Sequence, residues 1–516
     1  MNTAGGFAFE VSPWDRLDRF LTLGTEGGTY YISERALTIE NAHVVAELIR
    51  EDGPRVIERT IEISTSGRAP RNDPALYVLA MAAGLGNEST RAAALEAMPR
   101  VARTATHLFH WLHFVQAFRG WGRGVRRAVA GWYTDKDADR VAYQVLKYPS
   151  RDGWAHRDAL RLAHAKPPTT THDLIFRYAV KGWEAVDGAE GVDPDVMATF
   201  DAVRSLSGST PGEAARLISE HGLVREMVPT ELLRHAEVWE ALLERMPLMA
   251  MIRNLGVMTR VGLLAPMARA SDRVAARIGD GEVLRKARVH PIAILTALKT
   301  YASGRGVRGR GSWEPVTKVV DALDRAFYLS FGNVSGSGRR TMLALDVSGS
   351  MGMGVAGMPY LSCRDASAAM ALVTAATEPY HMFTAFTAGS HSFRGWQTGL
   401  QKIDVSPRQR LDDVVQRIGA MPFGATDCAL PMLEAMKHLW EIDAFVVYTD
   451  SETWAGEIHP VQALRQYRQR MGIPAKLIVV AMASNGFSIA DPDDAGMLDV
   501  VGFDAATPEL ISRFAA

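Results

Sequence analysis

One short segment places three oxygen-bearing side chains at alternate positions. The apolar run TMLALD, residues 341–346, ends on Asp346, and Ser348 and Ser350 follow it. A carboxylate and two hydroxyls spaced i, i+2 and i+4 on a turn can converge on one hard cation. Magnesium retains waters that an incoming acidic group can replace, so such a site suits binding rather than bond cleavage.

Two further oxygen donors lie at the ends of other predicted elements. Thr426 lies in the loop MPFGATD before a predicted helix, and Asp450 ends the apolar run AFVVYTD. In open parallel sheets, ligands bind outside the carboxyl ends of the strands. We therefore predict an Mg²⁺ or Mn²⁺ site formed by Asp346, Ser348, Ser350, Thr426 and Asp450. The alternative is a plain strand-to-helix turn, in which Ser348 or Ser350 caps the helix and Asp346 bonds to backbone amides.

A basic and aromatic segment is the second candidate for chemistry. Residues 101–181 carry 14 basic against 6 acidic side chains, whereas residues 1–340 as a whole carry 45 against 39. This local excess favours contact with the phosphates of a polyanion. The tryptophans of the segment, Trp111, Trp121, Trp132 and Trp154, are expected in the core rather than as base-stacking platforms. The phosphate contacts are expected from Arg119, Arg123, Arg126, Arg127, Lys147, Arg151, His164 and Lys166.

A second basic stretch, KTYASGRGVRGRGSW at residues 299–313, leaves two interpretations open. It contains Lys299, Arg305, Arg308 and Arg310, and no acidic residue. An Arg/Gly loop of this kind can follow a single-stranded backbone without reading its sequence. It can equally be a solvated linker.

The elements that position these residues differ between the two parts of the chain. From about residue 14 to 331, apolar residues recur at helical spacing, with expected helix caps at Ser89, Thr210 and Thr230. Tandem amphipathic helices predict a solenoid of helix pairs whose curvature can close into a ring. We place this region at residues 1–335.

The Gly/Ser stretch at residues 332–340 is interpreted as an interdomain linker. After it, the apolar runs 341–346, 381–386, 444–450 and 476–482 alternate with segments of helical periodicity. This order predicts a doubly wound α/β domain with a parallel sheet, covering residues 341–516.

The composition excludes several classes of protein. The chain has 516 residues, 47% hydrophobic and 22% charged, with a net charge of −1, which excludes wholesale disorder. Only two cysteines occur, Cys363 and Cys428, and no signal peptide or membrane-length apolar run is evident, so we expect a cytoplasmic protein. No GxxxxGK[ST] or HExxH motif is present, and the serines of DVSGS have no evident histidine base; we therefore expect a protein that is not an enzyme.

These motifs together resemble the Ro ribonucleoprotein family. The stretches FRGWGRGVRRAVAGWY, LKYPSRDGWAHRDALRLAHAKP and YAVKGW are similar to the TROVE domain, and LALDVSGSM, GATDCALPM and YTDSETWAG look like the Ro version of the von Willebrand factor A domain. One departure is Gly424-Ala425, where family members usually have two glycines before the metal-site threonine. Arginine outnumbers lysine by 47 to 10, which suits a bacterial member.

The resemblance implies a ring of HEAT-like helical repeats closed by the A domain. Family members bind RNA without cutting it: a small noncoding Y RNA on the outer face, and single-stranded 3′ ends of misfolded noncoding RNAs in the central hole, for RNA quality control. By motif position, the outer contacts fall on Lys147, Arg151 and His164, and the metal ligands on the five residues named above. Arg119, Arg123 and Arg127 are inferred from charge alone.

The resemblance also implies partners. Bacterial relatives cooperate with 3′-to-5′ exoribonucleases, whereas no membrane or DNA partner is expected, and we expect a monomer in the RNA complex. An alternative function stays open, a metal-dependent protein-interaction module that partners an ATPase or another protein offering an acidic residue.

Overall fold

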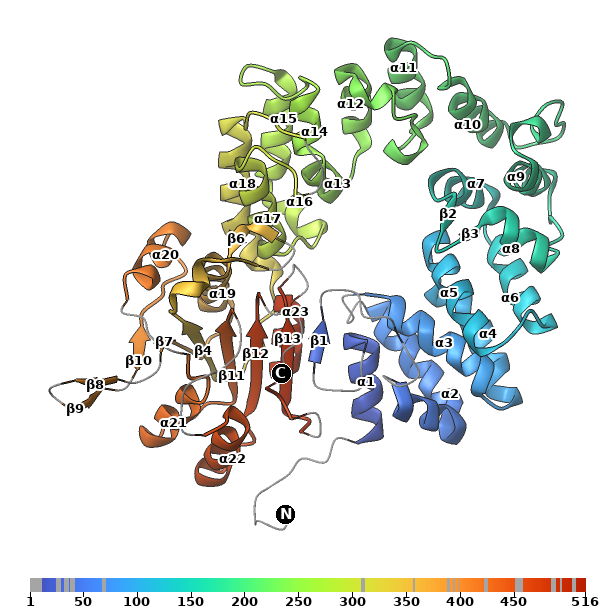
Figure 1. The fold of residues 1–516 in the computed structure, drawn as a ribbon. Coiled ribbons are helices and arrows are strands. Elements are labelled where there is room, and N and C mark those ends of the chain that lie inside the picture. The colour runs from blue at the N-terminus through green and yellow to red at the C-terminus, as the bar shows by residue number, and fades with distance from the viewer. Residues whose placement is uncertain are drawn as a thin grey trace.

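The fold is described from a computed structural model of the chain (Figure 1). The structure describes residues 12–24, 29–31, 37, 42–66, 71–307, 311–355, 358–387, 390–392, 395–397, 399–421, 426–450, 458–483, 489–491, 494–503 and 507–516. No helix within these ranges is long and apolar enough to cross a membrane.

Helices fill the first part of the chain, and neighbours such as α3 and α5, or α11 and α12, pack against each other (Figure 1). Each buries an apolar stripe against the next, which is how an array of short amphipathic helices is stabilised. The helices are α1 Pro13–Leu23, α2 His43–Ser66, α3 Asp73–Leu85, α4 Glu88–Val101, α5 Ala105–Phe118, α6 Arg123–Thr134, α7 Ala138–Lys147, α8 His156–Ala163, α9 Thr170–Lys181, α10 Pro194–Ser205, α11 Pro211–His221, α12 Ala236–Arg245, α13 Leu248–Arg253, α14 Leu255–Arg260, α15 Arg269–Ile278, α16 Gly281–Lys286, α17 Pro291–Ala302 and α18 Thr317–Leu329.

The expected helix caps are confirmed at one position and wrong at two. Thr210 caps α11 in a capping box with Glu213, as predicted. Helix α4 begins earlier than expected, because Asn87 rather than Ser89 accepts the hydrogen bond of the Thr90 amide. Thr230 caps no α-helix, since a short 3₁₀ turn precedes α12.

The second part contains a seven-stranded sheet of order β1-β13-β12-β11-β4-β7-β10. The chain passes from β4 to β7 on one side and returns to β11, β12 and β13 on the other, so the sheet is doubly wound as predicted. Among the described strands of this sheet, only β10 pairs antiparallel. The strands are β4 Thr341–Asp346, β7 His381–Phe386, β10 Leu400–Ile403, β11 Ala444–Thr449, β12 Lys476–Ala481, β13 Met497–Val501 and β1 Thr29–Tyr31, with short hairpins β2 Ser150–Arg151 and β3 Trp154–Ala155, β5 Gly354–Val355 and β6 Met358–Ser362, and β8 Ser390–Ser392 and β9 Gly395–Gln397.

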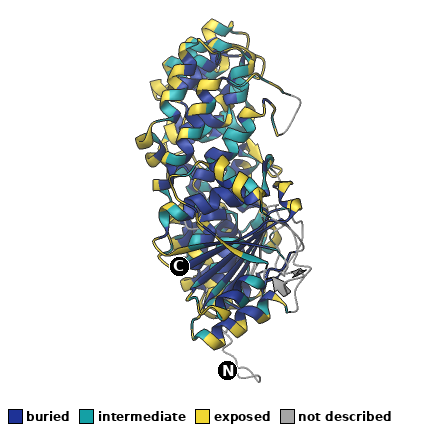
Figure 2. Cartoon of the chain, turned by 90° about the vertical axis from the view of Figure 1, so that its left-hand side faces the viewer, coloured by how far each residue is buried: buried dark blue, intermediate teal, exposed yellow. Residues whose placement is uncertain are grey.

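Helices cover both faces of this sheet, whose strands are buried (Figure 2). Leu343 and Leu345 face a core shared with α19 and α23, while Met342 and Ala344 face a core built with α21 and α22. The alternation along β4 explains why a continuous apolar run is needed where both faces are covered. The helices are α19 Cys363–Thr377, α20 Leu411–Gly419, α21 Leu430–Lys437, α22 Pro460–Met471 and α23 Thr507–Ala515.

Segments from the N-terminal and C-terminal parts of the chain pair at one edge of the sheet, so the helices form a closed ring with the sheet domain (Figure 1). Strand β1, from the N-terminal region, adds to the sheet in parallel with β13. The buried guanidinium of Arg19 on α1 donates to the backbone oxygen of Asp494, at 2.9 Å. The predicted two-domain architecture, a helical-repeat ring followed by a doubly wound α/β domain, is confirmed.

The linker and a second contact fix the other junction of the ring. Glu378 accepts hydrogen bonds from the amides of Ser337 and Gly338, so the stretch 332–340 is anchored rather than a loose tether. Lys299 on α17 forms an ion pair with Asp365 on α19, at 3.0 Å.

Candidate nucleic-acid interface and metal site

A short β-hairpin with a two-residue turn lies at the centre of the predicted nucleic-acid interface. Strands β2 and β3 pair Ser150 with Ala155 and Arg151 with Trp154. Asp152 and Gly153 between them have φ of 51° and 77°, the left-handed conformation that the tight turn of such a hairpin requires. Arg151 is thereby presented at the tip, with about half of its side chain exposed.

A contact between a histidine and a carboxylate ties this hairpin to helix α5. The carboxylate of Asp152 contacts Nδ1 of His110 and lies 3.6 Å from Nε of Arg151. The hairpin rests on α5 and α8, and the ring of Trp154 packs 5.7 Å from that of Trp121. Because the backbone is held from both sides, Arg151 is kept in a defined place.

Lys147 ends α7 directly before the hairpin. Its ammonium donates to the hydroxyl of Tyr143 at 2.8 Å and lies about 5 Å from the ring centres of Tyr143 and Tyr148. A cation over aromatic rings is held in direction without being neutralised. The structure therefore brings Lys147 and Arg151 to the same end of α7, as cations available to phosphate.

His164 lies at the C-terminal end of α8 and is exposed, with a left-handed φ of 52°. Helix α8 begins directly after β3, so His164 is joined to the hairpin through a short helix of 8 residues. His164 thus lies at the end of α8 that is farther from the hairpin, and its role in RNA binding stays a prediction.

The three arginines inferred from charge differ in their surroundings. Arg119 caps α5 and is half-buried, and its Nη1 donates to the carbonyl of Ala83 at 2.8 Å. Arg123 and Arg127 are exposed on α6, a helix that lies further from the centre of the ring than α5 (Figure 1). Arg119 thus has a structural hydrogen bond that sequence reasoning did not anticipate.

The tryptophans and the second basic stretch can also be placed. Trp111, Trp132 and Trp154 are buried in the core, as predicted, and Trp121 is partly buried against it. Lys299 is used in the ion pair with Asp365. Arg308 and Arg310 lie outside the described residues, as does Gly424-Ala425.

His156, at the start of α8, contacts the backbone directly before the hairpin. It is buried, and its two ring nitrogens lie 2.8 Å from the hydroxyl of Tyr133 and 3.0 Å from the carbonyl of Tyr148. Burial lowers the pKa of His156 to about 4. The neutral form is therefore required for this packing.

Acidification is expected to destabilise the chain partly through His156. The pKa of His156 is lower in the folded chain than in the unfolded chain. Its contribution to the free energy of unfolding is therefore fully present above about pH 6.5, and up to about 3 kcal/mol of it is lost as the pH falls towards 4. Calorimetry at pH 7 and pH 4.5 should show a smaller fall in melting temperature for His156→Gln than for the parent chain. Equal falls would contradict this assignment.

The predicted metal ligands meet at the carboxyl ends of β4 and β11, where the strand order reverses. The Asp346 Oδ2 atom accepts hydrogen bonds from the hydroxyls of Thr426 at 3.2 Å and Thr449 at 2.9 Å. Ser348 Oγ lies 3.0 Å from Ser350 Oγ. The structure therefore brings Asp346, both serines and Thr426 into one cluster.

Asp450 follows β11 directly and is buried beside this cluster. Burial raises the pKa of Asp346, and the neighbouring Asp450 carboxylate raises it further. Two carboxylates kept out of water near three hydroxyls are the surroundings that a divalent cation stabilises. The residues present fit an oxygen-liganded cation.

The alternative interpretation of DVSGS is partly correct. Oδ1 of Asp346 accepts the amide of Ser348 at 2.8 Å, as expected for a turn. Across the described ranges, no group of three or more His, Cys, Asp or Glu side chains is positioned to hold a metal, and the predicted set contains only two carboxylates. The turn and the cluster of oxygens coexist in the same residues.

Sequence reasoning missed four residues of these sites. His110, Tyr143 and Asp152 position the basic face, and Thr449 hydrogen bonds the central carboxylate. The Asp152-Gly153 dipeptide was an available hairpin signal, and Thr449 directly precedes the predicted ligand Asp450. His110 and Tyr143 had no signal beyond their place in a basic, aromatic segment.

Comparisons with known proteins identify the family of each part of the chain. The TROVE domain family matches residues 1–190 and 209–300, and the Ro60 vWA domain family matches residues 340–515. A Deinococcus radiodurans protein named RNA-binding protein RO60 is 43% identical over 518 residues, covering 100% of this chain and 94% of that protein. The chain belongs to the Ro family.

Other Ro proteins extend this likeness. A Caenorhabditis elegans protein, also named RNA-binding protein RO60, is 36% identical over 588 residues, covering 99% of this chain and 89% of that protein. The crystal structure of the Deinococcus radiodurans RO (RSR) protein superposes with a TM-score of 0.89 at 42% identity, covering 98% of this chain and 99% of that one. The bacterial Ro resemblance stated from the motifs is confirmed.

Proposed function

We propose that this chain binds RNA as the protein of a ribonucleoprotein, holding Y RNA on the outer surface of the ring and single-stranded 3′ ends of misfolded noncoding RNA at its centre. In this role it serves RNA quality control as a scaffold for decay, with a 3′-to-5′ exoribonuclease as partner. The chain itself supplies binding and not catalysis.

One observation carries the proposal: the braced hairpin with Lys147 and Arg151 at the same end of α7. Lys147 is held over two tyrosine rings and Arg151 projects from a two-residue turn, so two cations are preset at the surface. Preset cations lose little conformational entropy when they bind phosphates. The relatives named RNA-binding proteins support the same assignment.

The salt dependence of RNA binding tests this function. If about three phosphates are neutralised, affinity for an RNA hairpin with a single-stranded 3′ tail should fall about 30-fold between about 50 and 200 mM salt. The measurement is a fluorescence anisotropy titration, with a blunt duplex as the control RNA. Affinity that is indifferent to salt, or equal for the two RNAs, would argue against the proposal.

We further propose that Asp346, Ser348, Ser350, Thr426 and Asp450 hold Mg²⁺ or Mn²⁺. When bound, such an ion supplies a coordination position for an acidic group of a partner. The residues of this chain fix the oxygen donors around it and keep bulk water away from the buried Asp346.

Asp346→Asn should abolish this binding. The parent chain is expected to take up about one Mn²⁺, seen by electron paramagnetic resonance, with weaker uptake at pH 5 than at pH 7.5, because the raised pKa of Asp346 lets protons compete. Asp427→Asn, in the same loop region but outside the predicted set, is the matched control. Unchanged Mn²⁺ uptake by Asp346→Asn would refute the site.

The same variant separates RNA binding from the alternative function, a metal-dependent protein-interaction module. The oxygen cluster at the sheet edge is the observation that favours such a module. If the module is the main function, Asp346→Asn loses a co-purifying protein while RNA affinity is unchanged.

A further inference from the structure

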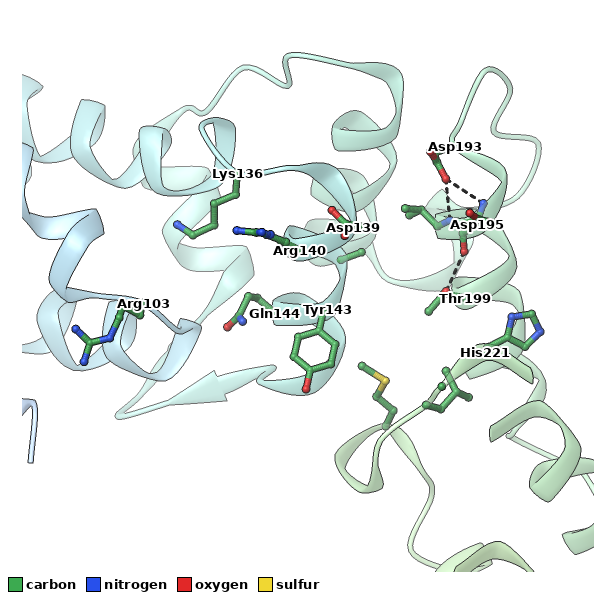
Figure 3. Close-up of a pocket in the computed structure, with 15 residues that line it drawn as sticks. Arg103, Lys136, Asp139, Arg140, Tyr143, Gln144, Asp193, Asp195, Thr199 and His221 are labelled. Carbon is green, nitrogen blue, oxygen red and sulfur yellow. Dashed lines mark hydrogen bonds between the residues drawn. The ribbon is translucent and has the colours of Figure 1, made fainter. Parts of the chain in front are cut away.

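A polar cavity of about 690 Å³ lies where α7 meets α10 and α11 (Figure 3). None of the residues predicted as RNA or metal contacts lines it. It adjoins the interface described above through Tyr143, which lines the cavity and accepts the hydrogen bond of Lys147. Its walls carry charges of opposite sign.

Cations gather on one wall. The nitrogens of Lys136, Arg140 and Arg103 lie on the same side of the cavity (Figure 3). Lys136 donates to the carbonyl of Trp132 and lies 3.9 Å from its ring centre, and no carboxylate among the described residues forms an ion pair with it or with Arg103. Burial lowers the pKa of Lys136 to about 8, so this ammonium is partly desolvated. A bound anion at this wall would stabilise the charged form of Lys136, which burial disfavours.

Carboxylates lie on the opposite side of the cavity. Asp193 and Asp195, at the start of α10, are exposed and face the cations across the opening (Figure 3). One oxygen of Asp193 accepts the amides of Asp195 and Val196, and neither carboxylate forms an ion pair with a described residue. Arg140 pairs with the exposed Asp137 at 3.7 Å, and Asp139 adds a carboxylate to the α7 side of the cavity. The two carboxylates at the start of α10 lie across the cavity from Lys136 and Arg103 (Figure 3).

The surface between the walls is partly apolar. Tyr143 is 39% exposed, and Ala142, Val196, Leu223 and Met227 add apolar surface, beside the polar side chains of Gln144, Thr199 and His221. An exposed tyrosine ring beside a cationic wall is the arrangement on which nucleic-acid bases stack.

We infer that this cavity binds a ribonucleoside 5′-phosphoryl group with a free 2′,3′-diol, as found at the 3′ terminus of an RNA or in a free ribonucleotide. Lys136, Arg140 and Arg103 receive the phosphate, and the Tyr143 ring receives the base. Asp193 and Asp195 accept hydrogen bonds from the diol, a role that carboxylates fill at ribose hydroxyls elsewhere. A terminal 3′-phosphate would meet the same carboxylates and be repelled.

This inference deepens the proposed RNA binding. It rests on the proposed function only where the occupant is the 3′ terminus of an RNA, and not where it is a free ribonucleotide. The test compares short single-stranded RNAs that end in a 3′-hydroxyl, a 3′-phosphate or a 2′,3′-dideoxynucleotide, together with free uridine 5′-monophosphate. The parent chain should prefer the 3′-hydroxyl RNA by about tenfold, because the carboxylates repel a terminal 3′-phosphate and a dideoxy end lacks the hydroxyls that would donate to them.

Variants assign this preference to the cavity. The double variant Asp193→Asn and Asp195→Asn, which keeps a side-chain oxygen able to cap α10, should reduce the preference to within about twofold. The double variant Lys136→Gln and Arg140→Gln should lower the affinity for all three RNAs by the same factor. Asp201→Asn, an exposed carboxylate on the same helix outside the cavity, is the matched control and should keep the full preference.

Each outcome decides a separate point. End preference that disappears in the double aspartate variant supports an RNA 3′ terminus as the occupant. If the parent chain shows no preference among the RNA ends but binds uridine 5′-monophosphate, and the double aspartate variant weakens that binding, the occupant is a free ribonucleotide. Equal affinity for all ends together with no binding of the mononucleotide overturns the inference. Failure of every RNA to bind would instead reject the proposed function, while the mononucleotide still tests the cavity.

Discussion

Replacing Lys147, Arg151 and His164 together by glutamine lowers the affinity for a structured RNA with a single-stranded 3′ tail by about 100-fold. Each lost contact to phosphate or base edge costs about 1 kcal/mol, and three such losses multiply. The salt dependence should also become shallower, because fewer counterions are released. Anisotropy titrations of the parent chain and the variant measure both effects.

The control for this variant removes charges that the structure places elsewhere. Arg204, Arg216 and Arg285 are surface arginines that each pair with a neighbouring carboxylate. Their joint replacement by glutamine removes at least as much positive charge, and affinity should change by less than about threefold, because these charges lie away from the hairpin and are largely screened at physiological salt. A similar loss in both variants would mean that net charge alone, and not the hairpin surface, controls RNA binding.

Asp494→Ala is expected to destabilise the chain by about 3–5 kcal/mol, because it removes the carboxylate that balances the charge of the buried Arg468 guanidinium. Arg468 and Asp494 have side chains only 4% and 6% exposed, and the two Arg468 nitrogens donate to the carboxylate at 2.5 and 3.2 Å. The backbone oxygen of Asp494 also receives Arg19, so the loss falls at the junction that closes the ring.

Calorimetry and limited proteolysis measure this loss. Arg465→Gln removes the neighbouring ion pair with Asp491, in which the arginine side chain is 49% exposed, and should cost less than about 1 kcal/mol. In Asp494→Ala, cleavage should begin in the residues around α1 and β13. Similar melting temperatures for the two variants would show that the buried pair does not stabilise the junction.

Four strands of the seven-stranded sheet could be predicted from the sequence. TMLALD and HMFTAF coincide with β4 and β7, and AFVVYTD and KLIVVAM extend one residue beyond β11 and β12. A strand buried on both faces must be apolar throughout, which makes it recognisable. The cluster around Asp346 followed from this, because parallel strands bring their carboxyl ends to one edge.

Other elements had no local signal. Strand β1 is only three residues long and lies in the otherwise helical part, and its pairing with β13 depends on the closure of the whole ring. The antiparallel strand β10 was missed for a similar reason, since its pairing is set by its neighbour β7. Local periodicity cannot reveal contacts between residues hundreds of positions apart.

The sequence predicted that the region around Lys147 and Arg151 is basic, but not which partner each cation contacts. Counting charges found the segment that holds Lys147 and Arg151, yet it treated Arg119 as equivalent, although its guanidinium donates to the Ala83 carbonyl. Charge counting also gave no indication that Lys136 and Arg140 line a cavity facing Asp193 and Asp195. Which partner a cation contacts is set by tertiary packing.

We propose that RNA lies on the surface formed by α7, the β2–β3 hairpin and α8. Photo-crosslinking of a tailed RNA hairpin containing photoreactive uridines, followed by mass spectrometry of the attached peptides, locates the bound RNA. We predict crosslinks in residues 136–164, reduced when Lys147, Arg151 and His164 are replaced. Crosslinks confined to residues 341–516 would show that the RNA lies on the sheet domain instead.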